Sequence, residues 1–446
     1  MTSAVLNSAP SHRTASRGLS GWKFWLPTLL VLLAIAIPDF AVVNVLQAAG
    51  VDLESNLVAT MATENSLREA AYLLSLLALG AAGVLLLMPG NQRQAPSGSV
   101  YVGLILGTFA LAVSSLLWSD DIQITFRRLV VAGLCVLGCW GIGRAWQTID
   151  LVRMVLWLSA TFAITGIAAE IYYGSFLAAA GYRFSGFLHP NQQALSCGLL
   201  VLAAMAMKTR TGRLTYWIVA LVAYSLLLMT GSRGGVVACT AAVGFYLVFA
   251  TPAPQRIVWF MLASLACGGG LLYLALEPAG GSRLEALAKL GRDDPQADPK
   301  SLTGRLPIWN QIVSDIRQRP AVGYGYAAYW TAERVHRMSY IHDWEFSNAH
   351  SSYLEVMLAF GLVGFGWGLL TVVAVFVRGL VLYATAPDWG LLFVLAVFVM
   401  AFTNGLIESN FVSVGYGFTV WLIGAFMIAY YPSRAMADAP AAWEPA

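Results

Sequence analysis

Three arginines and one histidine stand where their side chains could take part in chemistry: Arg183, Arg233, Arg305 and His350. Guanidinium groups offer planar, charged donors that suit the oxygens of a phosphate or diphosphate. A histidine side chain can exchange a proton near neutral pH, so it is a candidate general base. Together these residue types predict an anion-binding site with one proton acceptor.

Arg183 and Arg233 both fall in short breaks between apolar blocks. Arg183 lies in the segment 181–191, and Arg233 lies in a glycine-containing turn, 230–235, that opens the next block. One interpretation is that each side chain extends to the membrane surface and binds lipid phosphate. The other is that an ionisable group at membrane depth is functional. For Arg233, the free N–H groups of the helix that starts there would add to an anion site.

Arg305 lies near the start of a patterned segment, 303–320, that predicts a surface helix. Thr303 can cap this helix, and Pro320 ends it. We expect its apolar stripe to face the membrane surface or the helix ends beneath. The stripe comprises Leu306, Trp309, Ile312, Val313 and Ile316. A guanidinium at a helix N-terminus suits a phosphate, and the alternative is a solvent-exposed surface arginine.

The segment 323–330 that follows is rich in glycine and aromatic residues. Aromatic side chains near a membrane interface often serve only as anchors. They also stack on sugar rings, which a glycan-handling protein would use. We therefore carry Tyr324, Tyr326 and Trp330 as candidate substrate-binding residues.

His350 stands where the long polar segment returns to an apolar block. It is either a hydrogen-bonded packing residue or a general base. A zinc site formed with His336, His342 and Asp343 is a further alternative, but these residues share no recognisable ligand spacing. We therefore expect neither a metal nor another cofactor.

Composition identifies the kind of structure that must position these residues. Of the 446 residues, 58% are hydrophobic and 11% are charged, against about a quarter charged in a soluble protein. The apolar residues form blocks of about 17 to 25, the length of a helix that crosses a bilayer. In lipid, every backbone polar group must be paired within its own segment. The sequence predicts an all-α, polytopic integral membrane protein.

Twelve candidate spans follow from these blocks, with boundaries that are uncertain by several residues. They are 24–46, 70–88, 99–118, 129–146, 151–171, 192–207, 214–230, 234–250, 257–276, 351–377, 389–407 and 410–431. The first is expected to be a retained span rather than a signal peptide, because no small-residue cleavage site follows it. The chain divides into a membrane domain 1–276, a polar loop 277–350 with amphipathic helices, and a membrane domain 351–446 with a cytoplasmic tail.

The distribution of basic residues predicts the orientation. Placing both termini in the cytoplasm puts twelve basic residues in inner loops and five in short outer loops. The loop 277–350 then lies outside and carries nine basic and nine acidic residues. The net charge of +3 does not indicate nucleic-acid binding. All five cysteines fall in apolar blocks and are expected to be packing residues.

The sequence resembles the O-antigen ligase and Wzy polymerase superfamily of bacterial envelope glycan assembly. Within it, the segment around Gly323–Trp330 and His350 looks most like exopolysaccharide polymerases of the ExoQ type, although these more often have Asn in place of Ser351. No single motif is specific for this superfamily, but the order and spacing of several motifs around one long loop are specific for it. The motifs are Leu117–Asp121 with Arg127 and Arg128, Arg183 with Ser185–Asn191, Ser232-Arg233, Thr303–Trp309, Pro320–Gly325, Ala349-His350 with Tyr353-Leu354, and Gly361–Gly364.

The resemblance implies a GT-C-like glycosyltransferase architecture and an active site that faces the periplasm at the bacterial inner membrane. It implies metal-independent, inverting transfer from an undecaprenyl-diphosphate-linked glycan to a glycan acceptor. Arg233, Arg305 and Arg183 would hold the diphosphate, His350 would accept the proton, and Asn191 would contact substrate. Chain-length regulators and export proteins are the further partners that it suggests.

Three functions fit these features. The first is a polymerase that joins lipid-linked repeat units into exopolysaccharide or O-antigen. The second is a ligase that transfers a finished glycan to a lipid A core or another acceptor. The third is a polysaccharide transporter or flippase, which the sequence favours least, because it shows no internal repeat and its basic residues of interest lie at the outer face.

Overall fold

The computed structural model describes residues 19, 21–39, 56–88, 98–178, 182–251, 305–342, 348–409 and 412–431. Several predictions fall outside these residues. They are the span 257–276, the first part of the polar loop up to residue 304 with the cap Thr303, the packing role of Cys267, and the part of Asp343 in a zinc site.

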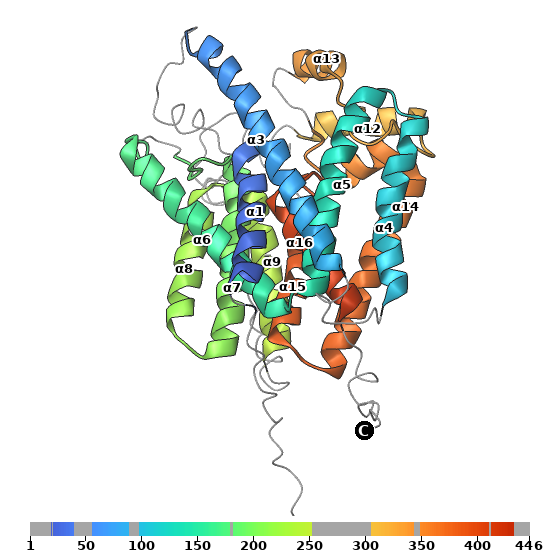
Figure 1. Ribbon diagram of the computed structural model, residues 1–446. Helices are drawn as coiled ribbons and strands as arrows, with labels where there is room; N and C mark the ends of the chain where they lie inside the picture. The colour runs from blue at the N-terminus through green and yellow to red at the C-terminus, as the bar shows by residue number, and fades with distance from the viewer. Residues whose placement is uncertain are drawn as a thin grey trace, which may run out of the picture.

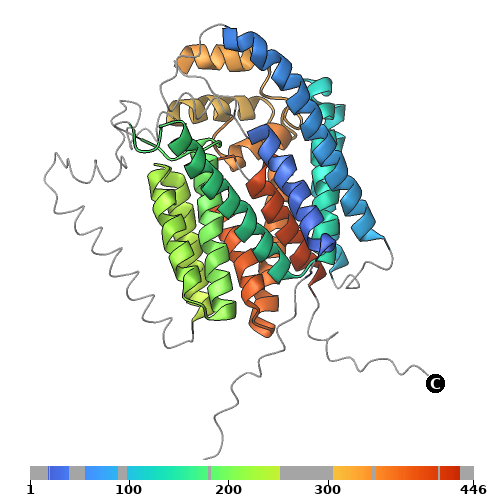
Figure 2. The same ribbon diagram turned by 60° about the vertical axis from the view of Figure 1, so that its left-hand side comes forward.

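The described residues form a helical bundle with two helices across one end (Figures 1 and 2). The helices are α1 (Trp22–Asp39), α3 (Asn56–Leu87), α4 (Ser99–Ser114), α5 (Ile122–Ala145), α6 (Thr148–Tyr172), α7 (Pro190–Thr211), α8 (Thr215–Met229), α9 (Arg233–Ala250), α12 (Arg305–Gln318), α13 (Ala332–His342), α14 (Ser352–Thr385), α15 (Trp389–Gly405) and α16 (Tyr416–Tyr430). A short 3₁₀ turn, Ser115–Leu117, follows α4.

Among the described residues, seven helices are long and apolar enough to cross a membrane, and four shorter apolar helices accompany them. Each coincides with a predicted span, so the all-α, polytopic membrane fold is confirmed. The number of crossings stays a prediction, because the span 257–276 is not among the described residues. Among the seven long helices, α7 is the most enclosed, with 78% of its most apolar stretch buried, whereas the share for the helical segment that contains α4 is 22%. Helix α7 therefore lies inside the bundle.

Basic side chains mark the end of the bundle where α1 begins and α16 ends. The guanidinium of Arg153 lies over Phe24 of α1, and that of Arg144 lies over Tyr430 of α16. Arg378 donates to the carbonyls of the last turn of α16. The distribution of basic residues in the sequence predicts Arg144, Arg153 and Arg378 on the cytoplasmic side of the membrane. The starts of α5 and α9 lie at the other end, beside α12 and α13 (Figure 1).

Helices α12 and α13 form a cap with a small core of its own. Ile308, Ile312 and Ile316 of α12 are buried and recur every four residues, which places them on one face of the helix. Of the predicted stripe, Ile312 and Ile316 lie on this buried face, whereas Leu306 and Val313 are exposed. The cap core also contains Ala349 and Leu358, so it extends into the first turns of α14.

A break in α14 joins the cap to the bundle. Gly361 has φ 62° and ψ −161°, so the helix is interrupted there. The segment 320–325 of the cap fills the break: Leu362 and Val363 donate to the carbonyls of Pro320 and Ala321, and Tyr324 and Gly325 donate to those of Leu358 and Ala359. The backbone groups freed by the break are thus paired with cap backbone.

An ion-pair cluster anchors the cap at a second point, the loop before α5. Asp120 accepts from Arg319 at 2.5 Å and from Arg334 at 2.7 Å. Trp118 in the same loop donates to the carbonyl of Val322 at 2.9 Å. The cap is therefore docked on two sides rather than hinged at one.

Replacing Gly361 by alanine should uncouple the cap from α14. A Cβ at this position would lie 2.3 Å from the carbonyl carbon of Ala321, in a backbone region that only glycine occupies readily. We expect a loss of about 1–3 kcal/mol or more in stability. It would be measured as a lower thermal midpoint of the solubilised protein. Gly368→Ala is the matched control, because its Cβ would meet nothing within 4 Å; equal midpoints for the two variants would contradict the expectation.

Candidate active site

A carboxylate that the sequence analysis did not single out, that of Glu408, lies at the centre of the site. It belongs to the loop between α15 and α16, and the residue is 7% exposed. Its backbone carbonyl accepts from both the N–H and the hydroxyl of Ser352, at 3.1 and 2.9 Å. The loop is thereby fixed to the start of α14, two residues after His350.

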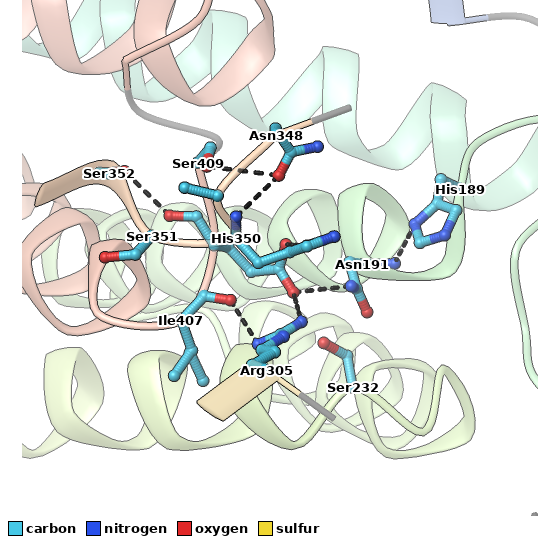
Figure 3. Close-up of polar contacts among 12 residues, drawn as sticks. His189, Asn191, Ser232, Arg305, Asn348, His350, Ser351, Ser352, Ile407 and Ser409 are labelled. Carbon is cyan, nitrogen blue, oxygen red and sulfur yellow. Dashed lines mark hydrogen bonds and ion pairs between the residues drawn. The ribbon is translucent and has the colours of Figure 1, made fainter. Parts of the chain in front are cut away.

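Arg305 pairs with this carboxylate. Its Nη2 lies 2.7 Å from Oε1 of Glu408, and its Nη1 donates to the carbonyl of Ile407 (Figure 3). Arg305 is the first described residue of α12, and its predicted position at a helix start stays a prediction because residues 301–304 lie outside the described residues. The arginine side chain is only 14% exposed. Its Nε is buried without a hydrogen-bond partner among the described residues, which leaves one donor available at the site.

His350 faces the other oxygen of the same carboxylate. Its Nδ1 lies 3.7 Å from Oε2 of Glu408, an ion-pair contact that is longer than a hydrogen bond. The backbone of His350 has φ 47°, a left-handed conformation that is uncommon for residues other than glycine. Its N–H donates to Oδ1 of Asn348 at 2.9 Å (Figure 3). The backbone of His350 is therefore held by Asn348, and its imidazole lies beside the carboxylate of Glu408.

Asn191 connects this group to Arg183. Its Nδ2 donates to Oε1 of Glu408 at 2.7 Å, and its Oδ1 accepts from Nη2 of Arg183 at 3.3 Å. Asn191 is the second residue of α7, whose N-cap is His189. Arg183 also donates through Nε to the carbonyl of Thr230 at 2.8 Å. The structure thus links two of the predicted anion-binding arginines through one amide and one carboxylate.

The loop that carries Arg183 is positioned by Glu170 at the end of α6. The buried carboxylate of Glu170 accepts the backbone N–H groups of Ser185 and Gly186, at 3.0 and 2.7 Å, and the hydroxyl of Tyr182. Burial raises the pKa of Tyr182, and the hydrogen bond to Glu170 raises it further. The tyrosine therefore stays protonated and continues to donate.

Arg233 is the first residue of α9, in the turn that packs between Arg183 and the Glu408 loop. Ser232 caps the helix by accepting from the N–H of Gly235. A Cβ at Gly231 would lie 3.2 Å from Nε of Arg183, and one at Gly234 would lie 2.2 Å from Cδ1 of Ile407. These close approaches bring the start of α9 to the site, as the sequence predicted, with the Arg233 side chain half-buried.

The candidate sugar-binding aromatics have different surroundings. Tyr324 is buried, its hydroxyl donates to the carbonyl of Asp315, and two guanidinium groups lie 4.8 Å from its ring. The expectation of an open stacking face at Tyr324 is therefore not supported. Tyr326 stacks on Phe360 with centroids 6.1 Å apart. The half-buried Trp330 donates through Nε1 to Glu355. Sugar binding by Tyr326 and Trp330 stays a prediction.

The electrostatics of the site follow from its burial and charges. Burial by itself would raise the pKa of Glu408, but the neighbouring His350 imidazole and Arg305 guanidinium outweigh it and lower that pKa. Glu408 is therefore a carboxylate at neutral pH. Such a group can hold an arginine in place and orient an imidazole at Nδ1, which leaves Nε2 for a substrate.

The sequence contained a signal for Glu408. It is the sole acidic residue between Asp388 and Asp438, and it follows directly on an apolar span. An ionisable residue at such a position is a functional candidate by default. By the rule that selected Arg183 and Arg233, Glu408 is a functional candidate too. Its contacts with Arg305 and Asn191 could not be predicted from the sequence.

Comparison with known proteins confirms the resemblance. Residues 217–367, which include Arg233, Arg305 and His350, match the family model described as O-antigen ligase. The chain is 30% identical over 198 residues to the exopolysaccharide production protein ExoQ of Rhizobium meliloti (strain 1021). This match covers 41% of the chain and 43% of that relative, so the chain matches less than half the length of the relative.

Proposed function

We propose, from its relationship to O-antigen ligases and to an exopolysaccharide production protein, that this chain is a membrane glycosyltransferase. It polymerises oligosaccharide repeat units that are linked to undecaprenyl diphosphate, and the product is an exopolysaccharide or O-antigen. Its site faces the periplasm of a bacterial inner membrane. The orientation is supported by the basic residues at the opposite end of the bundle.

The observation that carries this proposal is the meeting of Arg305, His350 and Asn191 at the carboxylate of Glu408. A diphosphate leaving group gathers negative charge as the glycosidic carbon separates from it. Preorganised guanidinium groups in a site with little water stabilise such charge strongly. Arg305 offers a buried donor, and Arg183 and Arg233 lie on the segments packed beside it.

In the reaction, a hydroxyl oxygen of the acceptor sugar attacks the anomeric carbon of the donor. The bond between that carbon and the diphosphate oxygen breaks, and attack from the opposite face inverts the configuration. The hydroxyl proton passes to Nε2 of His350, while Glu408 stabilises the imidazolium from the Nδ1 side. Undecaprenyl diphosphate leaves with the bonding electron pair, and its charge is held by the arginines. The step uses residues of this chain and no metal.

A second candidate is a ligase that transfers a finished glycan to a lipid A core or another acceptor. The description of the matching family model favours it, whereas the name of the relative favours exopolysaccharide production. Both functions use the same donor chemistry and differ in the acceptor. The chain-length regulators and export proteins suggested above belong to the polymerase proposal.

Glycans in a strain that lacks this chain should distinguish the candidates. A polymerase predicts that single lipid-linked repeat units accumulate and that high-molecular-weight polysaccharide disappears. A ligase predicts long lipid-linked chains that remain unattached. Gel analysis and mass spectrometry of the lipid-linked and surface fractions would measure both, with the strain complemented by the wild-type chain as the control. Unchanged glycans in both fractions would contradict both functions.

A further inference from the structure

Both backbone polar groups of Ala349, the residue before His350, are held by side chains. The N–H of Ala349 donates to Oε1 of Glu355, and the carbonyl of Ala349 accepts from Nε1 of Trp309 at 2.9 Å. Ala349 itself is fully buried. These groups belong to the two peptide groups on either side of the Ala349 Cα, so changing the φ or ψ angle of Ala349 would break a hydrogen bond away from water, at the cost of an unsatisfied polar group. Side chains outside the site therefore fix the backbone from which His350 extends.

Glu355 is held in turn by the cap. It lies in the first turn of α14, and Nε1 of Trp330 lies 3.1 Å from both of its carboxylate oxygens. The residue following Ala349 is the one with φ 47°. A conformation of this kind costs on the order of 1–3 kcal/mol and persists only when the surroundings impose it. Here Glu355 and Trp309 hold the backbone of Ala349, and Asn348 accepts the backbone N–H of His350. These hydrogen bonds keep His350 in its left-handed conformation.

We propose that Glu355 is a positioning residue that sets the direction of the His350 imidazole through the backbone of Ala349. The inference rests on the proposed function, because the direction of the imidazole matters only if His350 accepts the proton. Glu355 contacts neither His350 nor Glu408 by side chain in the described contacts; it acts through the backbone. Trp330, a candidate sugar-binding residue, is tied to the same carboxylate, so the cap and the base are connected through Glu355.

A positioning role predicts a specific kinetic result. Displacing a catalytic group by about 1 Å can cost about 100-fold in rate. Substrate binding by the arginines should be unaffected, because they do not contact the Ala349 peptide. Glu355→Leu should therefore lower kcat by about 100-fold. Because it also removes the acceptor of Trp330 Nε1, an unchanged KM is expected of Trp309→Phe, which leaves the bond between Trp330 and Glu355 in place. Glu355→Gln keeps one oxygen that can accept the Ala349 N–H, and should retain activity within about fivefold, the equivalent of one weakened hydrogen bond.

The experiment measures transfer by the full chain in proteoliposomes. The substrates are undecaprenyl-diphosphate-linked repeat units purified from the strain that lacks the chain, and rates are expressed per folded protein. Trp309→Phe removes the donor to the Ala349 carbonyl and should lower kcat in the same way. Glu333→Leu is the matched control, because Glu333 is an exposed acid of the cap without a contact to Ala349; its kcat should equal that of the wild type.

The outcomes separate this inference from the proposed function. No transfer by the wild-type chain would overturn the proposed function. An active wild type with kcat unchanged in Glu355→Leu, or with the same kcat loss in the Gln and Leu variants, would overturn the positioning role alone. Should Glu355→Leu fail to fold, Trp309→Phe decides: a lower kcat at constant KM supports the role, and a wild-type kcat overturns it.

Discussion

Replacing Glu408 by alanine should both destabilise the protein and abolish its polysaccharide product. The change leaves the guanidinium of Arg305, only 14% exposed, without its counter-charge and removes the acceptor of Asn191. Removing one partner of a buried ion pair leaves the other charge buried without compensation and costs about 3–5 kcal/mol of folding stability. The activity is lost because Arg305 and His350 no longer share an anchor. The thermal midpoint of the solubilised protein and gel analysis of the polysaccharide measure the two effects.

A double variant separates stability from function. In Arg305→Met with Glu408→Leu, both charges are absent, and replacing a buried pair by apolar residues of similar volume is often neutral or stabilising. We expect the thermal midpoint to recover while the product stays absent. Glu333→Ala, at an exposed position, should change neither quantity. A Glu408→Ala variant with a wild-type midpoint and full-length product would show that the carboxylate does not organise the site.

Replacing His350 by asparagine should remove activity without unfolding the protein. Asparagine tolerates the left-handed backbone found at this position, so the loop should keep its shape. Loss of a general base lowers the rate by about 10²–10⁴-fold. The initial rate of transfer from lipid-linked repeat units in proteoliposomes measures this loss, with KM expected to change little.

His336 provides the control for this change. It is an exposed histidine of α13, outside the group around Glu408, and His336→Asn should transfer sugar at the wild-type rate. Comparable rates for His350→Asn and the wild type would remove His350 from the proton transfer.

Two predicted features of the cap look different in the tertiary structure. The apolar stripe of α12 combines residues that the structure separates, because Ile312 and Ile316 are buried in the cap core whereas Leu306 and Val313 are exposed. The actual inner face contains Asp315, which accepts the hydroxyl of Tyr329, and so it is partly polar. Tyr324 was a candidate for sugar stacking; in the structure its backbone N–H donates to the carbonyl of Leu358 in the α14 break, and its side chain is buried.

What the sequence determined by itself was the membrane bundle, the order of its helices, the helix α12 that contains Arg305 and the return of the chain at His350. These features depend on the length and spacing of apolar residues and on local helix signals, which neighbouring residues supply. Only the tertiary structure decided that Glu408 meets Arg305, 103 residues earlier, and Asn191, 217 residues earlier. It also decided that the cap fills a break in α14 at Gly361. Contacts between residues so far apart in the sequence depend on how the helices pack and on where the helix ends lie. A local sequence pattern contains no information about such contacts.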